Sequence, residues 1–330
     1  MSCHRIPRTR VVRSALVALA LLSAFENGGA LAGYPDRIVR IVVPFAPGGG
    51  TDVIARALAQ EMARDLGGSI IIENRPGAGT IIGTQAVATS EPDGYTLLMG
   101  TFANAVNPSL NAKLPYDAHG AFAPVSLLAR SFNLVVVNPA SSIKSIADLI
   151  AAAKAEPDTL TYGTYGTGTS AHLAGELFKH MAKVNLTAVP YKGAAPAITD
   201  LIGGQIQVIF TTVASAASLV EAGQLRAIAV TSAERSAAFP RLPTVSEAGV
   251  PGYAAEAWYG LYAPAKTPLD IVDRLNRSAA KALQSDAFKR LSVNEGLAMV
   301  GGPPEELDRY FRAEEARWRQ MIQEAGIRIE

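Results

Sequence analysis

A strand, a glycine-containing loop and a helix follow one another repeatedly along this chain. Residues 38–43 form a β-branched run typical of a buried strand, and prolines and glycines at 44–50 end it. Residues 52–66 then carry an apolar side chain at every fourth position from Ile54, which predicts a helix with one buried face. Repeated strand–helix units predict parallel strands joined by crossover helices, so the expected fold class is α/β.

The same unit recurs in the middle of the chain. Strands are expected at 134–137, 160–162, 186–191 and 208–210, with helices between them. No low-complexity linker separates the two halves, which favours two lobes joined by strands near residues 130–133 and 256–259. The second lobe would then be an insertion within the first.

The N-terminus has the pattern of a secretory signal peptide. Four arginines and no acid lie in the first thirteen residues, an apolar run follows at 15–22, and Ala30-Leu31-Ala32 supplies a small-residue cleavage site. A membrane anchor is the alternative, but the run is shorter than the roughly 20 residues that a membrane span needs. Cleavage after Ala32 would change the net charge from +1 to −2, because four arginines and one glutamate leave.

Loss of residues 1–32 would also remove Cys3, the only cysteine. The exported chain would have no disulfide, thiolate metal site or thiol nucleophile, and must fold on its hydrophobic core. Its charge gives no basic footprint for nucleic acid. We therefore expect a soluble periplasmic protein.

The first loop of chemical interest is Pro47-Gly48-Gly49-Gly50-Thr51-Asp52, between a strand and a helix. Glycines allow the backbone close to a ligand, and a helix N-terminus presents free N–H groups and positive potential to an anion. No Gly-Lys-Ser/Thr follows, so the loop is not a nucleoside triphosphate site. A plain tight turn is the alternative, although three successive glycines exceed what it needs.

A second loop, at residues 163–172, again follows a strand and opens a helix. Gly166, Gly168 and Ala171 match the dinucleotide fingerprint, but no acid follows at the end of the next strand to hold a ribose. The loop is interpreted as a second anion cradle, and no cofactor or metal is expected. Residues 191–196 are either a third helix start at the same cleft or a surface turn.

Catalytic patterns are weak in this chain. It has no Gly-x-Ser-x-Gly nucleophile elbow, and His172 and His180 stand eight apart rather than at the spacing of a zinc pair. A binding protein is preferred and no catalytic residue is expected. A secreted α/β enzyme acting on a small organic acid remains the alternative, and an inorganic-anion receptor a third.

A long set of motifs resembles the Bug receptors, the TctC-like solute-binding receptors of the tripartite tricarboxylate transporter family. The resemblance covers essentially the whole chain after the signal peptide, in order. The first of these motifs is Tyr34-Pro35-Asp36-Arg37. The others lie at residues 43–49, 73–79, 92–97, 114–117, 190–193, 200–205, 242–249 and 263–268.

The resemblance implies a two-lobed periplasmic-binding-protein (Venus-flytrap) fold, each lobe a mixed, mainly parallel sheet flanked by helices. Lobe 1 is expected at 33–132 plus 257–330, and lobe 2 at 133–256. The receptor would act as a monomer, bind a small carboxylate, and pass it to a membrane permease or signal to a sensor. Family ligands include amino acids, di- and tricarboxylates and aromatic acids, so the particular acid does not carry over.

Ligand contacts implied by the family pattern lie on the two loops, with bridging water. The expected contacts are Phe45, Gly49, Gly50, Thr51, Asp52, Thr167, Gly168, Thr169, Ser170 and His172. Strand-end position adds Phe102, Asn104 and Thr212. Tyr165 stands where the family has small residues, and it would narrow the pocket, stack on a ligand ring or pack between the lobes.

Overall fold

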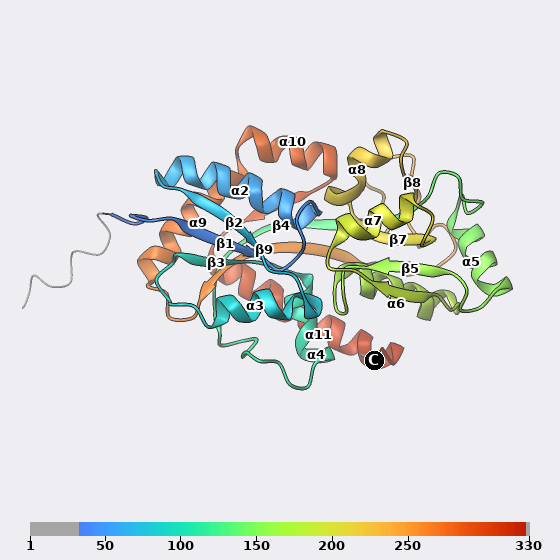
Figure 1. The fold of residues 1–330 in the computed structure, drawn as a ribbon, viewed down its shortest axis with the longest axis horizontal. Helices are drawn as coiled ribbons and strands as arrows, with labels where there is room; N and C mark the ends of the chain where they lie inside the picture. The colour runs from blue at the N-terminus through green and yellow to red at the C-terminus, as the bar shows by residue number, and fades with distance from the viewer. Residues whose placement is uncertain (1–32, 328–330) are drawn as a thin grey trace, which may run out of the picture.

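The computed structural model describes residues 33–327. Strands and helices alternate through most of this range, and Figure 1 shows them as two groups side by side along the long axis. The predicted signal peptide lies outside the described residues. None of the described helices has the length and hydrophobicity needed to cross a membrane.

The first sheet joins parallel and antiparallel strands. Strand β1 (Val39–Val43) pairs in parallel with β2 (Ile70–Asn74) and β3 (Thr96–Thr101). Strand β9 (Glu256–Pro264) is antiparallel to β3, and β4 (Phe122–Val137) is antiparallel to β9. The short β10 (Ala298–Gly301) pairs with β4 at its other edge. We call the part built on this sheet lobe 1.

The second sheet begins where the first ends, on the same long strand. Strand β4 pairs with β9 as far as Phe132 and with β7 (Val208–Thr212) from Asn133 onward. Strands β5 (Thr161–Thr164), β6 (Thr187–Pro190) and β8 (Arg226–Val230) complete this sheet, with β5 parallel to β6 and β7. We call the part built on this sheet lobe 2.

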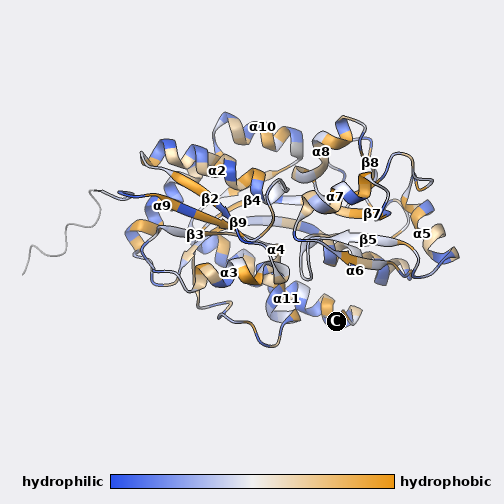
Figure 2. Ribbon diagram, viewed as in Figure 1, coloured by the Kyte–Doolittle hydropathy of each residue, from blue (hydrophilic) through white to orange (hydrophobic). Residues whose placement is uncertain are grey.

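Helices cover the faces of both sheets. In lobe 1 these are α2 (Gly50–Leu66), η1 (Ala78–Thr80), α3 (Ile81–Ala88), α4 (Phe102–Leu110), α9 (Leu269–Leu283), α10 (Asp286–Glu295) and α11 (Pro304–Ala325). In lobe 2 they are α5 (Ile146–Ala155), α6 (Ser170–Ala182), α7 (Ala194–Ile202) and α8 (Val213–Glu221). Figure 2 shows hydrophobic and hydrophilic residues alternating along the outer helices.

Two apolar clusters fill the space between sheets and helices, and each extends through both lobes. Alternate residues of β4 show the division, because Leu134 packs in one cluster and Val135 in the other. The predicted apolar face of α2 packs in the first cluster, with Ile54 and Leu58 fully buried. Helices therefore cover both faces of each sheet. The carboxyl ends of the parallel strands, and the helix starts that follow them, lie at the boundary between the lobes.

Candidate functional site

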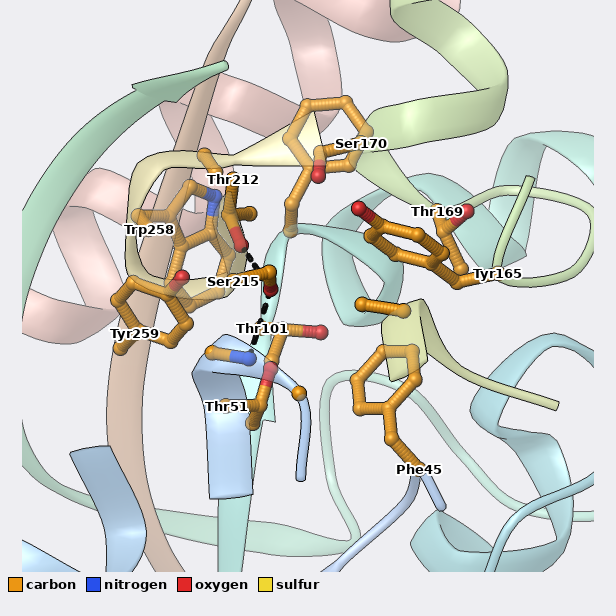
Figure 3. Close-up of a pocket in the computed structure, with 15 residues that line it drawn as sticks. Phe45, Thr51, Thr101, Tyr165, Thr169, Ser170, Thr212, Ser215, Trp258 and Tyr259 are labelled. Carbon is orange, nitrogen blue, oxygen red and sulfur yellow. Dashed lines mark hydrogen bonds between the residues drawn. The ribbon is translucent and has the colours of Figure 1, made fainter. Parts of the chain in front are cut away.

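A cavity lies between the two lobes, where strands end and helices begin. It encloses about 440 Å³ of empty space and is lined by fifteen residues. Figure 3 shows its labelled side chains converging from both lobes. The helix starts that contribute are those of α2, α4, α6, α7 and α8: Gly50 and Thr51, Phe102, Ser170, Ala194, and Ser215 within the first turn.

The first glycine loop contributes backbone to this inter-lobe cavity. Gly49 and Gly50 line it together with Thr51. The Gly50 N–H donates to Ser215 Oγ of lobe 2 at 2.8 Å, and Ser215 Oγ also bonds Thr212 Oγ1 at 2.8 Å (Figure 3). The Thr51 N–H lies in the first turn of α2, where a helix supplies no acceptor. This turn is therefore an available donor site for an anion.

Asp52 does not line the cavity; it braces the loop that does. Its carboxylate accepts from the Gly48 N–H at 3.0 Å, from Asn74 Nδ2 at 2.9 Å and from Arg56 Nε at 2.8 Å. Burial alone would raise the pKa of Asp52, but these donors outweigh it and hold the pKa below its usual range. The carboxylate thus stays ionised and fixes the loop.

The second glycine loop places Thr169 and Ser170 on the cavity wall. Thr169 is the N-cap of α6, and its hydroxyl donates to Gly166 O at 2.7 Å. The Ser170 N–H begins the helix and has no intrahelical acceptor. Each glycine loop therefore ends in a helix N-terminus at the cavity.

His172 is buried one turn into α6 and does not line the cavity. Its Nδ1 accepts the Gly168 N–H at 3.3 Å. Burial lowers the pKa of His172, although Glu176 acts in the opposite direction, so the ring is neutral and its nitrogen free to accept. In this structure His172 shapes the loop.

Tyr165 is a wall of the cavity. The side chain is buried, and its hydroxyl donates to Thr211 Oγ1 on β7. Burial raises the pKa of Tyr165, so the phenol stays protonated as a donor. The ring is thus anchored within lobe 2 and limits the space opposite Phe45, as Figure 3 shows.

The structure brings together nine of the predicted contacts and leaves five outside the lining. The nine are Phe45, Gly49, Gly50, Thr51, Phe102, Tyr165, Thr169, Ser170 and Thr212. Asp52, Asn104, Thr167, Gly168 and His172 are not among the lining residues. Asn104, for example, accepts the Thr101 N–H at 2.8 Å and donates to Thr84 Oγ1. Ligand contact by any of these residues stays a prediction.

Six lining residues were not predicted: Thr101, Ala194, Ser215, Ala257, Trp258 and Tyr259. Ala194 belongs to the turn at 191–196, which lines the cavity rather than forming a surface turn. Ser215 lies one helical turn beyond the end of a strand. Many residues of the chain have such a position, so the sequence alone does not single out Ser215 as a lining residue. Trp258 is fully buried on β9, and its indole Nε1 has no hydrogen-bond partner among the described residues.

The lining carries no charged side chain. It offers aromatic surface, hydroxyl groups, helix N-termini and the Trp258 N–H, a set that binds an anion through oriented donors. No group of histidine, cysteine, aspartate or glutamate side chains within residues 33–327 could hold a metal ion.

Known proteins were compared with the chain as a whole. Residues 54–327 match the family described as the tripartite tricarboxylate transporter family receptor. The chain belongs to this family. BugT of Bordetella pertussis, a curated relative, is 36% identical over 298 residues, which cover 90% of this chain and 91% of BugT. The Bug-type resemblance is therefore confirmed.

Solved relatives have the same fold. Rpa4515 of R. palustris, determined with adipate, is 40% identical with a TM-score of 0.86, covering 89% of this chain and 99% of that protein. MatC of Rhodopseudomonas palustris, with bound malate, is 32% identical with a TM-score of 0.84, covering 87% and 99%. Periplasmic binding proteins are among the other structural matches. The predicted two-lobed periplasmic-binding-protein fold is confirmed, and the chain is a receptor-family protein.

Proposed function

We propose that this tripartite tricarboxylate receptor captures a small organic carboxylate in the inter-lobe cavity. The observation that carries the proposal is the charge-free lining, into which the N-termini of α2 and α6 and the unpaired Trp258 N–H present donors. Each helix N-terminus favours an anion by roughly 0.3–1 kcal/mol, and more when partly buried. Adipate and malate, the ligands of two relatives, are dicarboxylates, which makes this class the first to test.

The ligand would contact Thr51 and Ser170 through backbone N–H and hydroxyl groups, and Tyr165 would set the size limit. The lobes would be residues 33–132 plus 257–330 and residues 133–256, and they would close on the ligand. The receptor would reach the periplasm through its cleaved signal peptide, act as a monomer, and serve a permease or a sensor.

A calorimetry and thermal-shift panel tests the ligand class. It should contain mono-, di- and tricarboxylates, acidic amino acids, aromatic acids, sulfate, phosphate and neutral sugars. A specific ligand raises stability by RT ln(1 + [L]/Kd), about 2.7 kcal/mol at a hundredfold excess over Kd. Binding of sugars or inorganic anions alone would reject the proposal, and recovery of a chemically altered acid would favour the enzyme alternative.

Thr51→Val and Ser170→Ala test the two-loop model. Each removes one hydroxyl donor and should weaken carboxylate binding about 3- to 10-fold, while the melting temperature of the ligand-free protein stays unchanged. Exposed Thr199→Val on α7 and Ser218→Ala on α8 are matched controls. Unchanged affinity in both test variants would remove the two loops from the site.

A further inference from the structure

A second cavity lies within lobe 1, under the loop that joins α4 to β4. About 460 Å³ of space free of protein atoms, part of it open to solvent, lies between the α4–β4 loop, the sheet and α11. We call it the lobe 1 cavity. All of its lining residues belong to strands, helices and loops of lobe 1, so it does not depend on contact between the lobes.

Aromatic rings form most of its wall. Tyr116, Phe122 and Tyr262 follow one another edge to face, with ring centroids 5.9 Å and 6.1 Å apart. Phe311 of α11 lines the opposite part and contacts the His119 ring at 6.0 Å. Edge-to-face walls of this kind accept a further flat ring, because ring edges and faces carry opposite partial charges.

Two buried hydroxyl groups in this wall, those of Tyr116 and Tyr262, have no hydrogen-bond partner among the described residues. The Tyr262 hydroxyl bonds no other described residue, although the side chain is 93% buried. Burial and the carboxylate of Asp308 raise the pKa of Tyr262, so the hydroxyl keeps its proton and can donate it. A buried hydroxyl without a partner costs free energy, which an acceptor placed in the cavity would recover.

The carboxylates at this cavity are already paired with arginines. Asp308 lines the cavity and pairs with Arg312, while Glu315, which pairs with Arg319, lies 3.4 Å from Nε2 of the lining His119. Asn104, which also lines the cavity, already bonds the Thr101 N–H and Thr84. The cavity therefore combines flat apolar walls and two unpartnered hydroxyl groups with carboxylates whose charge is already compensated, a set that suits an uncharged ligand.

We propose that the lobe 1 cavity is a second small-molecule site, which takes an uncharged planar aromatic molecule with one hydrogen-bond acceptor. The ring lies among Tyr116, Phe122 and Phe311, and its acceptor receives the Tyr262 proton. This site is separate from the inter-lobe cavity, although the two share a wall: Trp258 lines the one and contacts Phe311 of the other at 6.5 Å between ring centroids. Its occupant would be uncharged, unlike the carboxylate proposed for the inter-lobe cavity.

Benzamide is the probe, because it is flat, neutral and has a carbonyl acceptor. Binding is measured by calorimetry and by chemical-shift mapping on isotope-labelled protein, with and without saturating adipate. We expect a dissociation constant on the order of 1 mM, typical of a ligand of this size. The shifts should cluster around residues 98–124 and 308–311 and persist when adipate is present. Shifts at the inter-lobe cavity alone, or loss of binding with adipate, would overturn the proposal.

Tyr262→Phe keeps the ring and removes the donor, so benzamide binding should weaken about 3- to 10-fold. Tyr95→Phe changes a tyrosine that lines neither cavity, so it is the control and should leave benzamide binding unchanged. Ala118→Trp fills the cavity from its rim and should abolish binding. Melting temperatures verify that each variant is folded. Equal benzamide affinity in Tyr262→Phe and wild type, or a crystal soaked in benzamide that shows only water here, would refute the site.

Discussion

Single side chains decide how the two lobes touch. Ser215 of lobe 2 accepts the Gly50 N–H of lobe 1 and holds Thr212 by its hydroxyl. A backbone bond adds to this contact, because the Ala46 N–H donates to Lys192 O at 3.0 Å. Because such bonds exist only while the lobes are together, each one stabilises the closed form relative to the open form.

Ser215→Ala should therefore weaken ligand binding without unfolding the protein. Loss of one neutral hydrogen bond costs about 0.5–1.5 kcal/mol, so the closed form becomes less populated and the measured Kd rises about 3- to 10-fold. Calorimetry with the identified acid measures this. Ser218→Ala, one turn further along α8 and exposed, is the control. Equal Kd values for the two variants would show that Ser215 has no part in closure.

Asp52 is expected to make stability depend on acidic pH. Because its folded-state pKa lies below the unfolded value near 3.9, its contribution is complete above that value and is lost as pH falls through the folded pKa. Asp52→Asn should cost about 1–3 kcal/mol at pH 7 and flatten the loss of stability below about pH 4. Urea unfolding from pH 3 to 7 measures both.

The comparison variant is Asp273→Asn, an exposed aspartate on α9. It should follow the wild-type profile throughout. If Asp52→Asn also followed the wild-type profile, the bracing carboxylate would not stabilise the loop.

At the scale of secondary structure, the candidate site is formed where the N-termini of several helices lie close together. Five helices begin at the inter-lobe cavity, and each of them follows a strand that pairs in parallel with a neighbouring strand. Parallel strands direct their carboxyl ends to one edge of a sheet, and the chain there turns into a helix with free N–H groups. Two sheets facing each other at these edges would create the proposed anion site without a basic side chain.

Gly50→Ala tests whether the α2 terminus must approach lobe 2. A Cβ at Gly50 would lie 2.8 Å from Ala214 Cβ and 2.8 Å from Thr212 Oγ1. Since the backbone is already helical there, alanine should stabilise the open protein by up to about 1 kcal/mol while obstructing closure. We expect an unchanged or higher melting temperature without ligand, and at least a tenfold loss of affinity.

Gly203→Ala is the matched control for this substitution. Gly203 has φ −72°, and an added Cβ there would have no neighbour nearer than 3.4 Å. It should leave affinity unchanged. Normal ligand affinity in Gly50→Ala would show that the lobes need not come this close.

At the scale of the whole molecule, the two lobes are in direct contact, as expected of a closed form. Gly79 of lobe 1 lies so near Thr167 of lobe 2 that a Cβ could not fit between them, and a Cβ on Gly49 would lie 3.3 Å from the Cβ of Ala194. Two lobes joined by β4 and β9 can separate by small backbone changes where β4 passes between the sheets. Opening would expose the cavity to ligand.

Small-angle X-ray scattering should detect this motion. We expect the radius of gyration of the ligand-free receptor to exceed that of the ligand-saturated receptor, whose scattering should match the structure described here. Gly50→Ala should keep the larger radius at ligand concentrations that close the wild type. Identical scattering with and without a ligand that calorimetry shows to bind would contradict closure.

The sequence by itself determined the elements and the general chemistry. Hydrophobic periodicity located the buried face of α2, and two strand–glycine–helix segments located the loops of the candidate site. Within those loops, the family pattern selected Thr51, Thr169 and Ser170, which line the cavity, together with Asp52 and Thr167, which do not. These signals are local, because periodicity and turn composition act over a few residues. The series of motifs was sufficient to predict the family, and the comparisons confirm that prediction.

Only the tertiary structure decided which residues share a wall. Asp52 and His172 have the residue types and positions of ligand contacts, yet both point their polar atoms at their own loops. Trp258 and Ser215 reach the cavity from strands and turns distant in sequence. The pairing of β4 with both sheets brings these segments together, and pairing between distant segments depends on packing across the whole chain, which no local pattern specifies.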